Sequence, residues 1–498
     1  MREKPGIEKG DLILFNNMED WIEQDSPVFL IDKFVDSFLQ QDHIEFEGKT
    51  VEYCKGKKKT GERPYGAGHL LKLYIYGYYN RVSSSYRLVT ESRRNLEAIY
   101  LLRGLKPSRR TISDFRMLNG DLIKAAFLYL NEHLLKKGII LGRSISIDGT
   151  KIKANANKTI DKHLEKWQEQ LQYKMQEYLE HVSAEDKDTD TVKEEMGAAI
   201  KERDKKVAEL EEELKLLSKA LDDLKKGKSL PKEVVDKCGK LDLDCRRMIH
   251  KDGSIQPSFN AQVAVDNDSH CIISNKITTE ANDINQLLDV VDKVSKTTDH
   301  LPEEVLADSG YSNFDQMQEL EKRGLEENGK KTDLYIPILK MASETNDELN
   351  ELSFVFNKEE NSCICPNGVA LDYRGIRESR GHRYSVFEGK LRICSNCPLY
   401  GKCTKSKTKG RSVWIGENKE YKKRKIEEMS APDAQKKIKS RKGKIENVFG
   451  TLKTWMGKIP LLLRGKTKIS IELDLYCMAY NLRRVVSIYA EKNISLSF

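Results

Sequence analysis

Apolar residues recur every three or four positions along most of the first 140 residues. This is the spacing of one face of an α-helix, and polar or glycine residues separate each run from the next. The runs predict helices at 28–40, 69–80, 83–104, 111–120 and 120–137. Residues 1–140 should therefore form an all-helical domain of short helices joined by tight turns.

The period changes at residue 143, where RSISIDGTKIKAN alternates between apolar and polar residues as a strand does. Further strand-like runs follow at 259–267, 271–280, 304–312 and 334–338, with an amphipathic helix at 283–296. The first two of these runs are separated by a short polar turn, which favours a hairpin. This order predicts a mixed sheet in which the strands ending at residues 148 and 308 lie side by side. The segment 341–430 is irregular in pattern, and helices are predicted at 433–456 and 470–491.

A highly charged segment separates the first strand from the others. Aliphatic residues repeat there with the spacing of a heptad seam, namely Val207, Leu210, Leu214, Leu217, Leu221 and Leu224. An earlier stretch offers a second apolar stripe, namely Leu164, Trp167, Leu171, Met175 and Tyr178. We predict an antiparallel helical hairpin inserted between two strands. Its 14 basic and 19 acidic side chains over residues 161–230 favour contact with protein rather than with phosphates, and an inert spacer is the alternative.

Composition excludes several classes of protein. The chain has 498 residues, of which 38% are hydrophobic and 33% charged, enough for about three domains. No run approaches the ~18 apolar residues that a membrane span needs, and the start MREKPGIEKGDLILF lacks a signal-peptide pattern. We therefore expect a cytoplasmic protein with no membrane partner. The ten cysteines are too few for a disulfide scaffold and should be reduced.

The net charge of +8 is unevenly distributed. Residues 401–498 carry 24 basic and 9 acidic side chains, and residues 51–120 carry 15 and 5. Two distant basic blocks indicate a long anionic partner such as nucleic acid, although a basic surface kept for solubility is the alternative. Arg109 and Arg110 lie in the second block. Their helical setting fits either a helix-turn-helix reader or a plain bundle with solvated arginines.

Five of the cysteines cluster within 341–430. Cys394 and Cys397 form a Cys-x2-Cys pair, a spacing that is typical of metal ligands. Zinc held by four thiolates would stabilise a segment that has little core of its own, and reduced cysteines without metal are the alternative. The candidate zinc ligands are Cys363, Cys365, Cys394, Cys397 and Cys403, one more than a tetrahedral site needs.

Three acidic residues could carry chemistry. Asp148 ends the first predicted strand, Asp308 ends the fourth, and Glu446 lies on a late helix. Two carboxylates at the ends of adjacent strands repel one another unless a cation lies between them, and Mg²⁺ is suited to that place. Two such ions could serve an in-line displacement at phosphorus. Taken singly, an Asp before Gly is usually a turn residue and a helical Glu is usually solvated.

The surroundings of Glu446 add to this pattern. At ~100° per residue, Lys442, Glu446 and Lys453 fall on one stripe of the predicted helix. A carboxylate between two lysines suits a site that binds both metal and phosphate. The alternative is an ordinary surface pair between Glu446 and Lys442, four residues apart.

Five segments, in this order, resemble bacterial insertion-sequence transposases of the DDE superfamily: IDGTKIKANANK, FNAQVAVDN, ITTEANDINQL, LADSGYSN and RKGKIENVFGTLKTWMG. The helical segment from Gly68 to Arg116 is similar to the domain that precedes the catalytic domain in one branch of that group, and the ending LRGKTKISIELDLYCMAYNLRRVV is similar to the same branch. Most of the chain except the charged hairpin is covered.

The resemblance implies a ribonuclease H-like catalytic domain in which Asp148, Asp308 and Glu446 are the DDE triad and bind Mg²⁺ or Mn²⁺. Lys453 fits the Glu-x6-Lys spacing of the family. Related enzymes carry an Arg four residues before the Glu, where this chain has Lys442, with Arg441 displaced by one position. We expect Lys442, Lys453 and Arg441 to contact DNA, together with Arg109 and Arg110.

The expected fold class is α/β (α+β): a ribonuclease H-like mixed sheet with helices, an all-helical N-terminal domain, a coiled-coil hairpin insertion and a Cys-rich insertion. The expected divisions are a helical DNA-binding domain (1–140), the first catalytic strand (141–160), the hairpin (161–230), the catalytic core (231–340), the Cys-rich and zinc-binding insertion (341–430) and the C-terminal catalytic helices with Glu446 (431–498).

The resemblance further implies an enzyme that cleaves double-stranded DNA at the ends of an insertion sequence and transfers the strands into target DNA by two-metal phosphoryl transfer. It would act as a homodimer or larger assembly, in the bacterial cytoplasm and associated with the nucleoid. The alternative is a catalytically silent or domesticated DNA-binding protein descended from such an enzyme.

Overall fold

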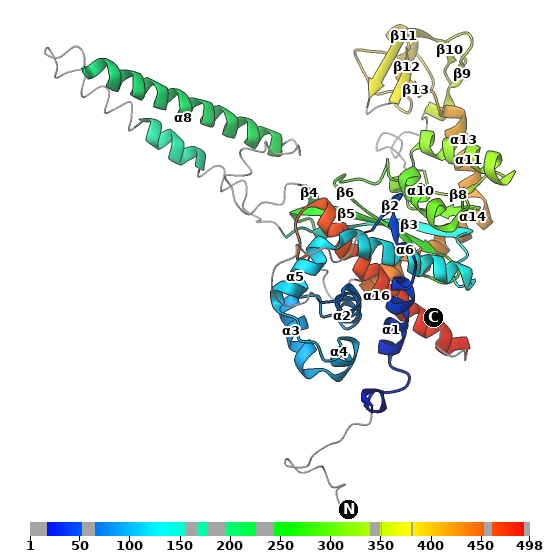
Figure 1. Ribbon diagram of the computed structural model, residues 1–498. Helices are drawn as coiled ribbons and strands as arrows, with labels where there is room; N and C mark the ends of the chain where they lie inside the picture. The colour runs from blue at the N-terminus through cyan, green and yellow to red at the C-terminus, as the bar shows by residue number, and fades with distance from the viewer. Residues whose placement is uncertain are drawn as a thin grey trace, which may run out of the picture.

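The structure of the protein is a computed structural model that describes residues 17–51, 65–155, 167–176, 195–225, 244–338, 349, 351–379, 382–452 and 461–492. Figure 1 shows helices packed around a central mixed sheet, from which a helical arm and a small second sheet extend. Leu164, Tyr178 and Lys453, all considered above, lie outside the described residues.

Short helices fill the N-terminal region, as the sequence predicts. Their bounds are η1 (Met18–Trp21), α1 (Pro27–Leu39), α2 (Ala67–Tyr79), α3 (Ser85–Arg94), α4 (Leu96–Leu101), α5 (Arg109–Leu118) and α6 (Gly120–Lys136), and a small hairpin β1 (Glu45–Phe46) and β2 (Lys49–Thr50) lies between α1 and α2. The prediction of one helix over 83–104 is wrong, because Asn95 breaks it and its side chain caps α4 by accepting from the amides of Glu97 and Ala98.

The main sheet has six strands in the order β4-β5-β3-β7-β8, with β6 pairing β5 on a branch. The bounds are β3 (Ser144–Lys153), β4 (Arg246–Ile249), β5 (Ile255–Asp266), β6 (Ile272–Thr278), β7 (Glu304–Leu306) and β8 (Asp333–Tyr335). The predicted hairpin is β5–β6, and β3 pairs antiparallel with β5 and parallel with β7. The prediction that the first and fourth strands are neighbours is therefore confirmed.

Helices from both ends of the chain cover this sheet: α10 (Leu287–Thr298), α11 (Phe314–Asn328) and α16 (Lys466–Lys492) join α6, with the short turn η2 (Ser309–Tyr311) after β7. The N-terminal helices and the main sheet share one continuous apolar core. Polar contacts cross it as well, since Arg116 on α5 pairs with Glu472 on α16 at 3.2 Å and Asn481 donates to Asn131 on α6. The α/β fold class predicted from the sequence is confirmed, with a helical N-terminal region attached to the sheet.

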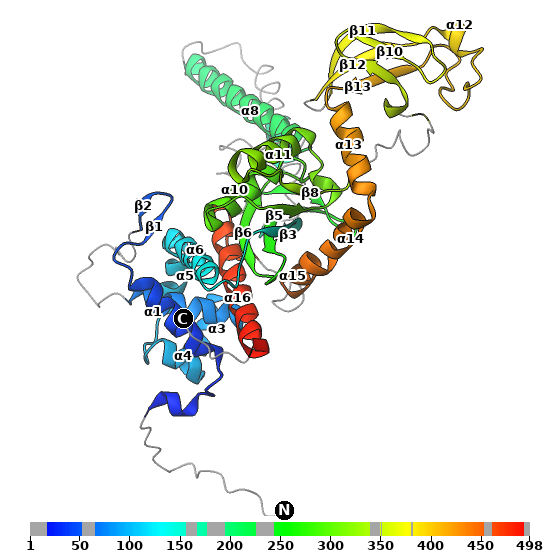
Figure 2. The same ribbon diagram turned by 90° about the vertical axis from the view of Figure 1, so that its right-hand side faces the viewer.

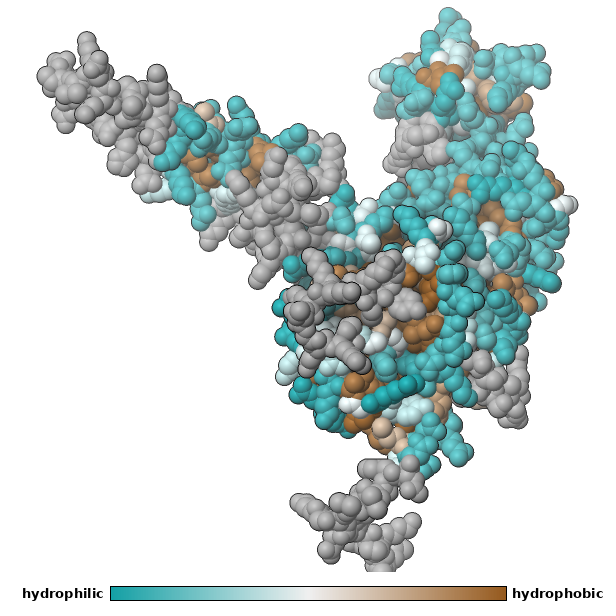
Figure 3. All heavy atoms as spheres, viewed as in Figure 1, coloured by the Kyte–Doolittle hydropathy of each residue, from teal (hydrophilic) through white to brown (hydrophobic). Residues whose placement is uncertain are grey.

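The arm consists of α8 (Glu195–Lys225) and a second helix at 167–176, and it extends away from the body in Figure 1. A small core joins the two helices, with Leu171 packed against Leu217, Ala220 and Leu221 and with Trp167 beside them. The predicted heptad seam thus finds its partner within the chain. Figure 3 shows a largely hydrophilic surface on the described part of the arm, with a few apolar residues between the two helices.

The prediction of an irregular segment at 341–430 is wrong. After η4 (Glu351–Ser353), a five-stranded antiparallel sheet is formed by β9 (Val355–Asn357), β10 (Ser362–Ile364), β11 (Ala370–Ser379), β12 (His382–Glu388) and β13 (Ser412–Gly416), with the short helix α12 (Leu391–Cys394) before β13. We call residues 355–416 the Cys-rich unit. Its core is separate from the main one and consists of Phe354, which immediately precedes β9, together with Cys363, Leu371, Phe387, Val413 and Ile415.

Helices α13 (Lys419–Ser430) and α14 (Pro432–Arg441) connect the Cys-rich unit to the main body, as Figure 2 shows. The chain then makes a π-helical turn, η5 (Lys442–Glu446), before α15 (Asn447–Gly450). The single helix predicted at 433–456 is therefore interrupted. Its assumed stripe at 100° per residue does not hold through η5, since a π turn joins residues five apart instead of four.

Candidate active site

The register of two parallel strands brings Asp148 and Asp308 together. Strand β3 pairs with β7 through Ser146 opposite Leu306. Asp148 and Asp308 each lie two residues beyond that pair, so they occupy equivalent positions on neighbouring strands. Their carboxylates are close enough for the charge of Asp308 to raise the pKa of Asp148.

The Asp148 carboxylate is half-buried and electrostatically strained. Burial, together with the charge of Asp308, raises its pKa to about 6, against the opposing effect of Arg441. Arg441 Nη1 lies 3.4 Å from Asp148 Oδ2, and the backbone amide of Gly149 donates to Asp148 Oδ1 at 2.8 Å. A cation beside Asp148 would oppose this repulsion and favour the ionised carboxylate.

Asp308 holds the turn that follows β7. Its Oδ1 accepts from the amide of Gly310 at 2.8 Å and so caps the turn η2. On each aspartate one oxygen accepts from a nearby backbone amide, that of Gly149 for Asp148 and that of Gly310 for Asp308. The second oxygen of Asp148 faces Arg441, and the second oxygen of Asp308 makes no hydrogen bond among the described residues. Two oxygen donors on adjacent strands suit Mg²⁺ or Mn²⁺, which prefer hard oxygen ligands.

Sequence reasoning missed a third carboxylate at this place. Asp283, in the loop between β6 and α10, accepts from Asn260 Nδ2 at 2.7 Å and from Gln262 Nε2 at 2.6 Å. Its charge acts on Asp148 and on Tyr311. A signal was present, because Asn260 and Gln262 are polar residues that alternate on an otherwise apolar strand and are buried.

The third predicted member of the triad, Glu446, lies at the end of the π turn η5, which packs against β3. Its side chain is exposed, as is that of Lys442, whereas Arg441 is buried beside Asp148. Among the residues that the structure describes, no three His, Cys, Asp or Glu side chains are arranged to hold a metal ion. The structure thus brings Asp148 and Asp308 together with Arg441 and leaves Glu446 turned to solvent.

The remaining basic candidates lie on α5, far along the chain from this site. Arg109 and Arg110 begin that helix and are exposed, and Arg110 Nε is 3.5 Å from Asp114 Oδ2. An exposed pair at this separation contributes little to stability, so both side chains are available to a ligand.

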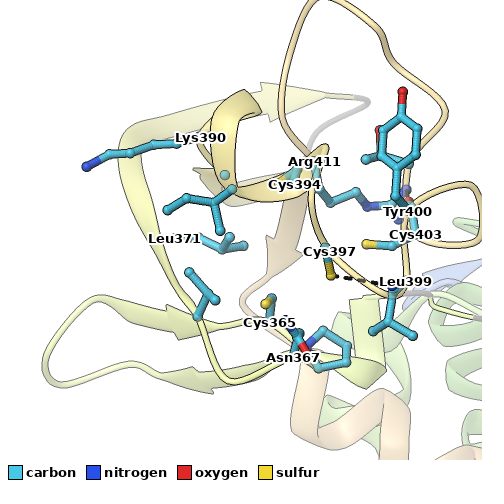
Figure 4. Close-up of a pocket in the computed structure, with 15 residues that line it drawn as sticks. Cys365, Asn367, Leu371, Lys390, Cys394, Cys397, Leu399, Tyr400, Cys403 and Arg411 are labelled. Atoms are coloured by element: carbon cyan, nitrogen blue, oxygen red, sulfur yellow. Dashed lines mark hydrogen bonds between the residues drawn. The ribbon is translucent and has the colours of Figure 1, made fainter.

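Four of the five clustered cysteines line one pocket of the Cys-rich unit, namely Cys365, Cys394, Cys397 and Cys403, as Figure 4 shows. The amide of Leu399 donates to Cys397 Sγ at 3.4 Å. Burial raises the pKa of the Cys403 thiol, and the three other cysteines raise it further. The fifth candidate, Cys363, is instead fully buried in the core of the unit.

Comparison with protein families gives two matches. The family model described as "Transposase DDE domain" matches residues 364–486, and the model described as "Transposase domain (DUF772)" matches residues 16–118. The first match includes most of the Cys-rich unit and Glu446, whereas Asp148 and Asp308 lie outside both. No curated protein and no solved structure matches the chain. The two matches confirm the resemblance to insertion-sequence DDE transposases that the sequence motifs indicate.

No helix in the described part of the chain is both long and apolar enough to span a membrane.

Proposed function

We propose that this insertion-sequence DDE transposase cleaves double-stranded DNA at the ends of its element and joins the freed ends to target DNA. The observation that carries the proposal is the pair of half-buried carboxylates, Asp148 and Asp308, at equivalent positions on the adjacent strands β3 and β7. The two family matches, one on either side of this pair in the sequence, support the same class of reaction.

Asp148 and Asp308 would hold a divalent cation, Mg²⁺ or Mn²⁺, through the oxygens that do not accept from a backbone amide, and Arg441, which now faces the Asp148 oxygen, would turn to the DNA phosphate. Such a cation, when bound, stabilises charge on the phosphate and lowers the pKa of an attacking water or hydroxyl. Arg441 would orient the DNA backbone, and the backbone amides of Gly149 and Gly310 hold the two aspartate side chains in place.

Arg441 is suited to a DNA phosphate at this site. It is buried, and its Nη1 has no hydrogen-bond partner despite the ion pair with Asp148. A buried guanidinium N–H without an acceptor is costly, and a phosphate oxygen would satisfy it. Glu446 ends the π turn that packs against β3. It is exposed in the structure, so it would have to turn toward the two aspartates to complete the triad.

DNA would also contact the basic C-terminal region through Lys442 and Lys453, and the exposed arginines Arg109 and Arg110 at the start of α5. Two such regions suit a duplex that is held at two places, and an assembly of two or more copies would hold two ends at once. We place this activity on the bacterial chromosome, in the cytoplasm.

The test is a cleavage assay on DNA that carries the flanking ends of the element. Asp148→Ala, Asp308→Ala and Glu446→Ala should each lower the cleavage rate by about 10³-fold or more, since electrostatic groups at such centres contribute several kcal/mol. Binding of the ends without metal should change little. Glu326→Gln is the matched control, because Glu326 is an exposed acidic residue paired only with Lys322 on the same helix.

Full activity of Asp308→Ala would overturn the mechanism. Wild-type protein that binds the ends tightly but never cleaves them, with any divalent cation, would favour the catalytically silent DNA-binding protein instead. If Glu446→Ala stays active while both aspartate variants lose activity, Glu446 is not a catalytic residue. The catalytic carboxylates are then Asp148 and Asp308 alone among the three candidates.

We further propose that the Cys-rich unit binds one structural Zn²⁺ through Cys365, Cys394, Cys397 and Cys403. Four thiols on one pocket form the donor set of structural zinc sites, and the amide of Leu399 already donates to one of the sulfurs. Since no metal-binding group of three is formed among the described residues, the thiols have to draw closer around the ion.

Metal analysis tests this zinc site. Purified protein should contain about one zinc per chain, and Cys397→Ser should lose it. Cys363→Ala is the matched control, because that thiol lies in the core of the same unit and away from the pocket; it should keep the zinc. Metal-free folded wild type, or zinc lost equally in both variants, would contradict the assignment.

A further inference from the structure

We propose that Asp283 is a positioning residue of the active site, whose carboxylate holds the β3 backbone beside Asp148 and the turn after Asp308 at a fixed separation. The inference rests on the cation site proposed above and adds a residue to it. Asp283 lies in the loop that connects β6 to α10, whereas Asp148 lies within β3 and Asp308 follows β7. Three separate elements therefore meet here.

Asp283 lies between Gly149 on β3 and Gly310 in the turn after Asp308. A methyl group added to Gly149 would lie 2.5 Å from Gln262 Nε2 and 2.7 Å from Asp283 Oδ1, and one added to Gly310 would lie 3.6 Å from Asp283 Oδ2. A residue larger than glycine at position 149 would displace the Gln262 amide or this carboxylate. The carboxylate thus lies close to the glycine beside Asp148 and to the glycine of the Asp308 turn, with one oxygen toward each.

A buried hydrogen-bond network fixes the carboxylate in this place. Asn260 and Gln262, which are almost fully buried on β5, both donate to Asp283 Oδ1. The hydroxyl of buried Tyr311 bonds to Gln262 Oε1, which determines that the amide nitrogen of Gln262 faces Asp283. Burial and the charge of Asp283 raise the pKa of Tyr311, so its hydroxyl stays protonated and donates.

Register connects the network to the catalytic strand. Gln262 on β5 lies opposite Gly149 on β3, and Asn260 lies opposite Lys151. The network therefore runs from β5 through Asp283 to Gly149 on β3 and to the turn after Asp308, and none of its hydrogen bonds goes to a carboxylate oxygen of Asp148 or Asp308. Residues that orient metal ligands in this indirect way typically contribute 10–100-fold to metal affinity.

Mn²⁺ binding by the full-length protein, measured by electron paramagnetic resonance without DNA, tests the proposal. Asp283→Ala should weaken Mn²⁺ binding by about 10-fold or more, whereas Asp283→Asn should weaken it by less than ~3-fold, because its amide oxygen can still accept from Asn260 and Gln262. Asn282→Ala, at an exposed neighbour in the same loop, is the matched control. Binding of the DNA ends without metal and the melting temperature should not change in Asp283→Asn.

Each outcome bears on a different claim. Unchanged Mn²⁺ affinity in Asp283→Ala overturns the positioning role, and so does an equal loss in Asp283→Asn and Asp283→Ala, which would make the charge and not the position decisive. Should Asp283→Ala fail to fold, Tyr311→Phe carries the test: it removes only the hydroxyl that orients Gln262, and unchanged affinity there overturns the inference. If the wild type binds no Mn²⁺, and Asp148→Ala gives the same Mn²⁺ signal as the wild type, the cation site itself is overturned and the inference falls with it.

Discussion

In the main sheet the central strand β3 pairs with two strands far from it in the chain, β5 and β7, whereas the sheet of the Cys-rich unit pairs each strand with its neighbour in sequence. In the main sheet, β3 lies between β5 and β7 and its core continues into the N-terminal helices. In the Cys-rich unit, β9 to β13 run up and down around six buried side chains. The long-range sheet positions the carboxylates, and the local sheet carries the thiols.

This difference has an energetic consequence. A large shared core unfolds cooperatively, so damage at one point should be felt across the helices and the sheet together. A core of six side chains supplies little free energy of unfolding, and such units commonly depend on a metal or a disulfide. The first two predictions below test this difference by where in the molecule a substitution acts.

The largest effect is expected at Arg116, the buried cation that joins the N-terminal helices to α16. It pairs with Glu472, and both side chains are at most 4% exposed. Arg116→Met leaves Glu472 as an uncompensated buried charge and should lower the free energy of unfolding by about 3–5 kcal/mol. Urea unfolding followed by both far-UV and near-UV circular dichroism should show one earlier transition.

The double variant Arg116→Met/Glu472→Gln is the control, because it removes both charges and keeps an acceptor for the amides of Leu462 and Leu463. It should recover much of the loss. Two separate transitions in Arg116→Met, with the helices lost before the sheet, would show that the common core does not act as one cooperative unit.

A matched pair of phenylalanines compares the two sheets directly. Phe259 on β5 and Phe387 on β12 are both fully buried. Phe→Ala at such positions costs about 3–5 kcal/mol. Hydrogen exchange should show that Phe387→Ala exposes amides only within residues 355–416, whereas Phe259→Ala accelerates exchange across the main sheet and the N-terminal helices. Loss of protection in the main sheet of Phe387→Ala would remove the distinction between the two regions.

Sequence patterns predicted the strands of the main sheet better than those of the Cys-rich unit. Alternation in RSISIDGT and the later apolar runs were enough to make neighbours of β3 and β7, and hence of Asp148 and Asp308. The strands of the Cys-rich unit were missed because they are short or exposed: β9 and β10 have three residues each, and Tyr373 and Ile376 on β11 are turned to solvent. Such strands lack the alternation that identifies a half-buried strand.

The candidate site was predicted in part for a similar reason. Asp148 lies within β3 and Asp308 follows β7, and the register of these strands is readable from the alternating pattern. The expectation that the first strand ends at Asp148 is wrong, because pairing with β5 continues to Lys153. Asp283 is held from a loop, and its partners Asn260 and Gln262 become meaningful only when β5 lies beside β3. The π turn at Lys442–Glu446 has no distinct sequence pattern, so the position of Glu446 relative to Arg441 could not be derived from an α-helical projection.

A smaller effect should come from pH, at a buried carboxyl of the shared core. Burial raises the pKa of Asp474 on α16 to about 6, while Asn275, which donates to it at 2.8 Å, and the charges of Lys124 and Lys293 oppose the change. A raised pKa favours the protonated carboxyl in the folded state, so this stability is present below about pH 4 and is lost as the pH rises through about 6.

Asp474→Asn removes this dependence. Between pH 4 and 7, the free energy of unfolding of the wild type should fall by about 2 kcal/mol relative to that of the variant. Urea titrations of both proteins at several pH values measure the difference, in which the other titrating groups cancel. Asp299→Asn, at an exposed position, should give parallel curves with the wild type. Parallel curves for Asp474→Asn as well would mean that this carboxyl is not held in its protonated form.

The smallest effect on the main sheet should come from the largest deletion, replacement of residues 161–230 by a short Gly/Ser linker. The arm has its own core around Leu217, and the pairing of β3 with β5 extends from Ile145 opposite Asp266 to Lys153 opposite Ser258 without it. Because loop-closure entropy changes slowly with length, the free energy of unfolding of the main sheet should change by less than ~1 kcal/mol. Leu217→Asp, which disrupts the arm core and keeps the chain length, should behave in the same way.

Light scattering and paired-end cleavage then decide what the arm does: smaller assemblies and uncoupled cleavage in both variants make it a contact between subunits. Unchanged assembly and unchanged coupling make it a spacer, because an arm that no other subunit touches has no route to either property.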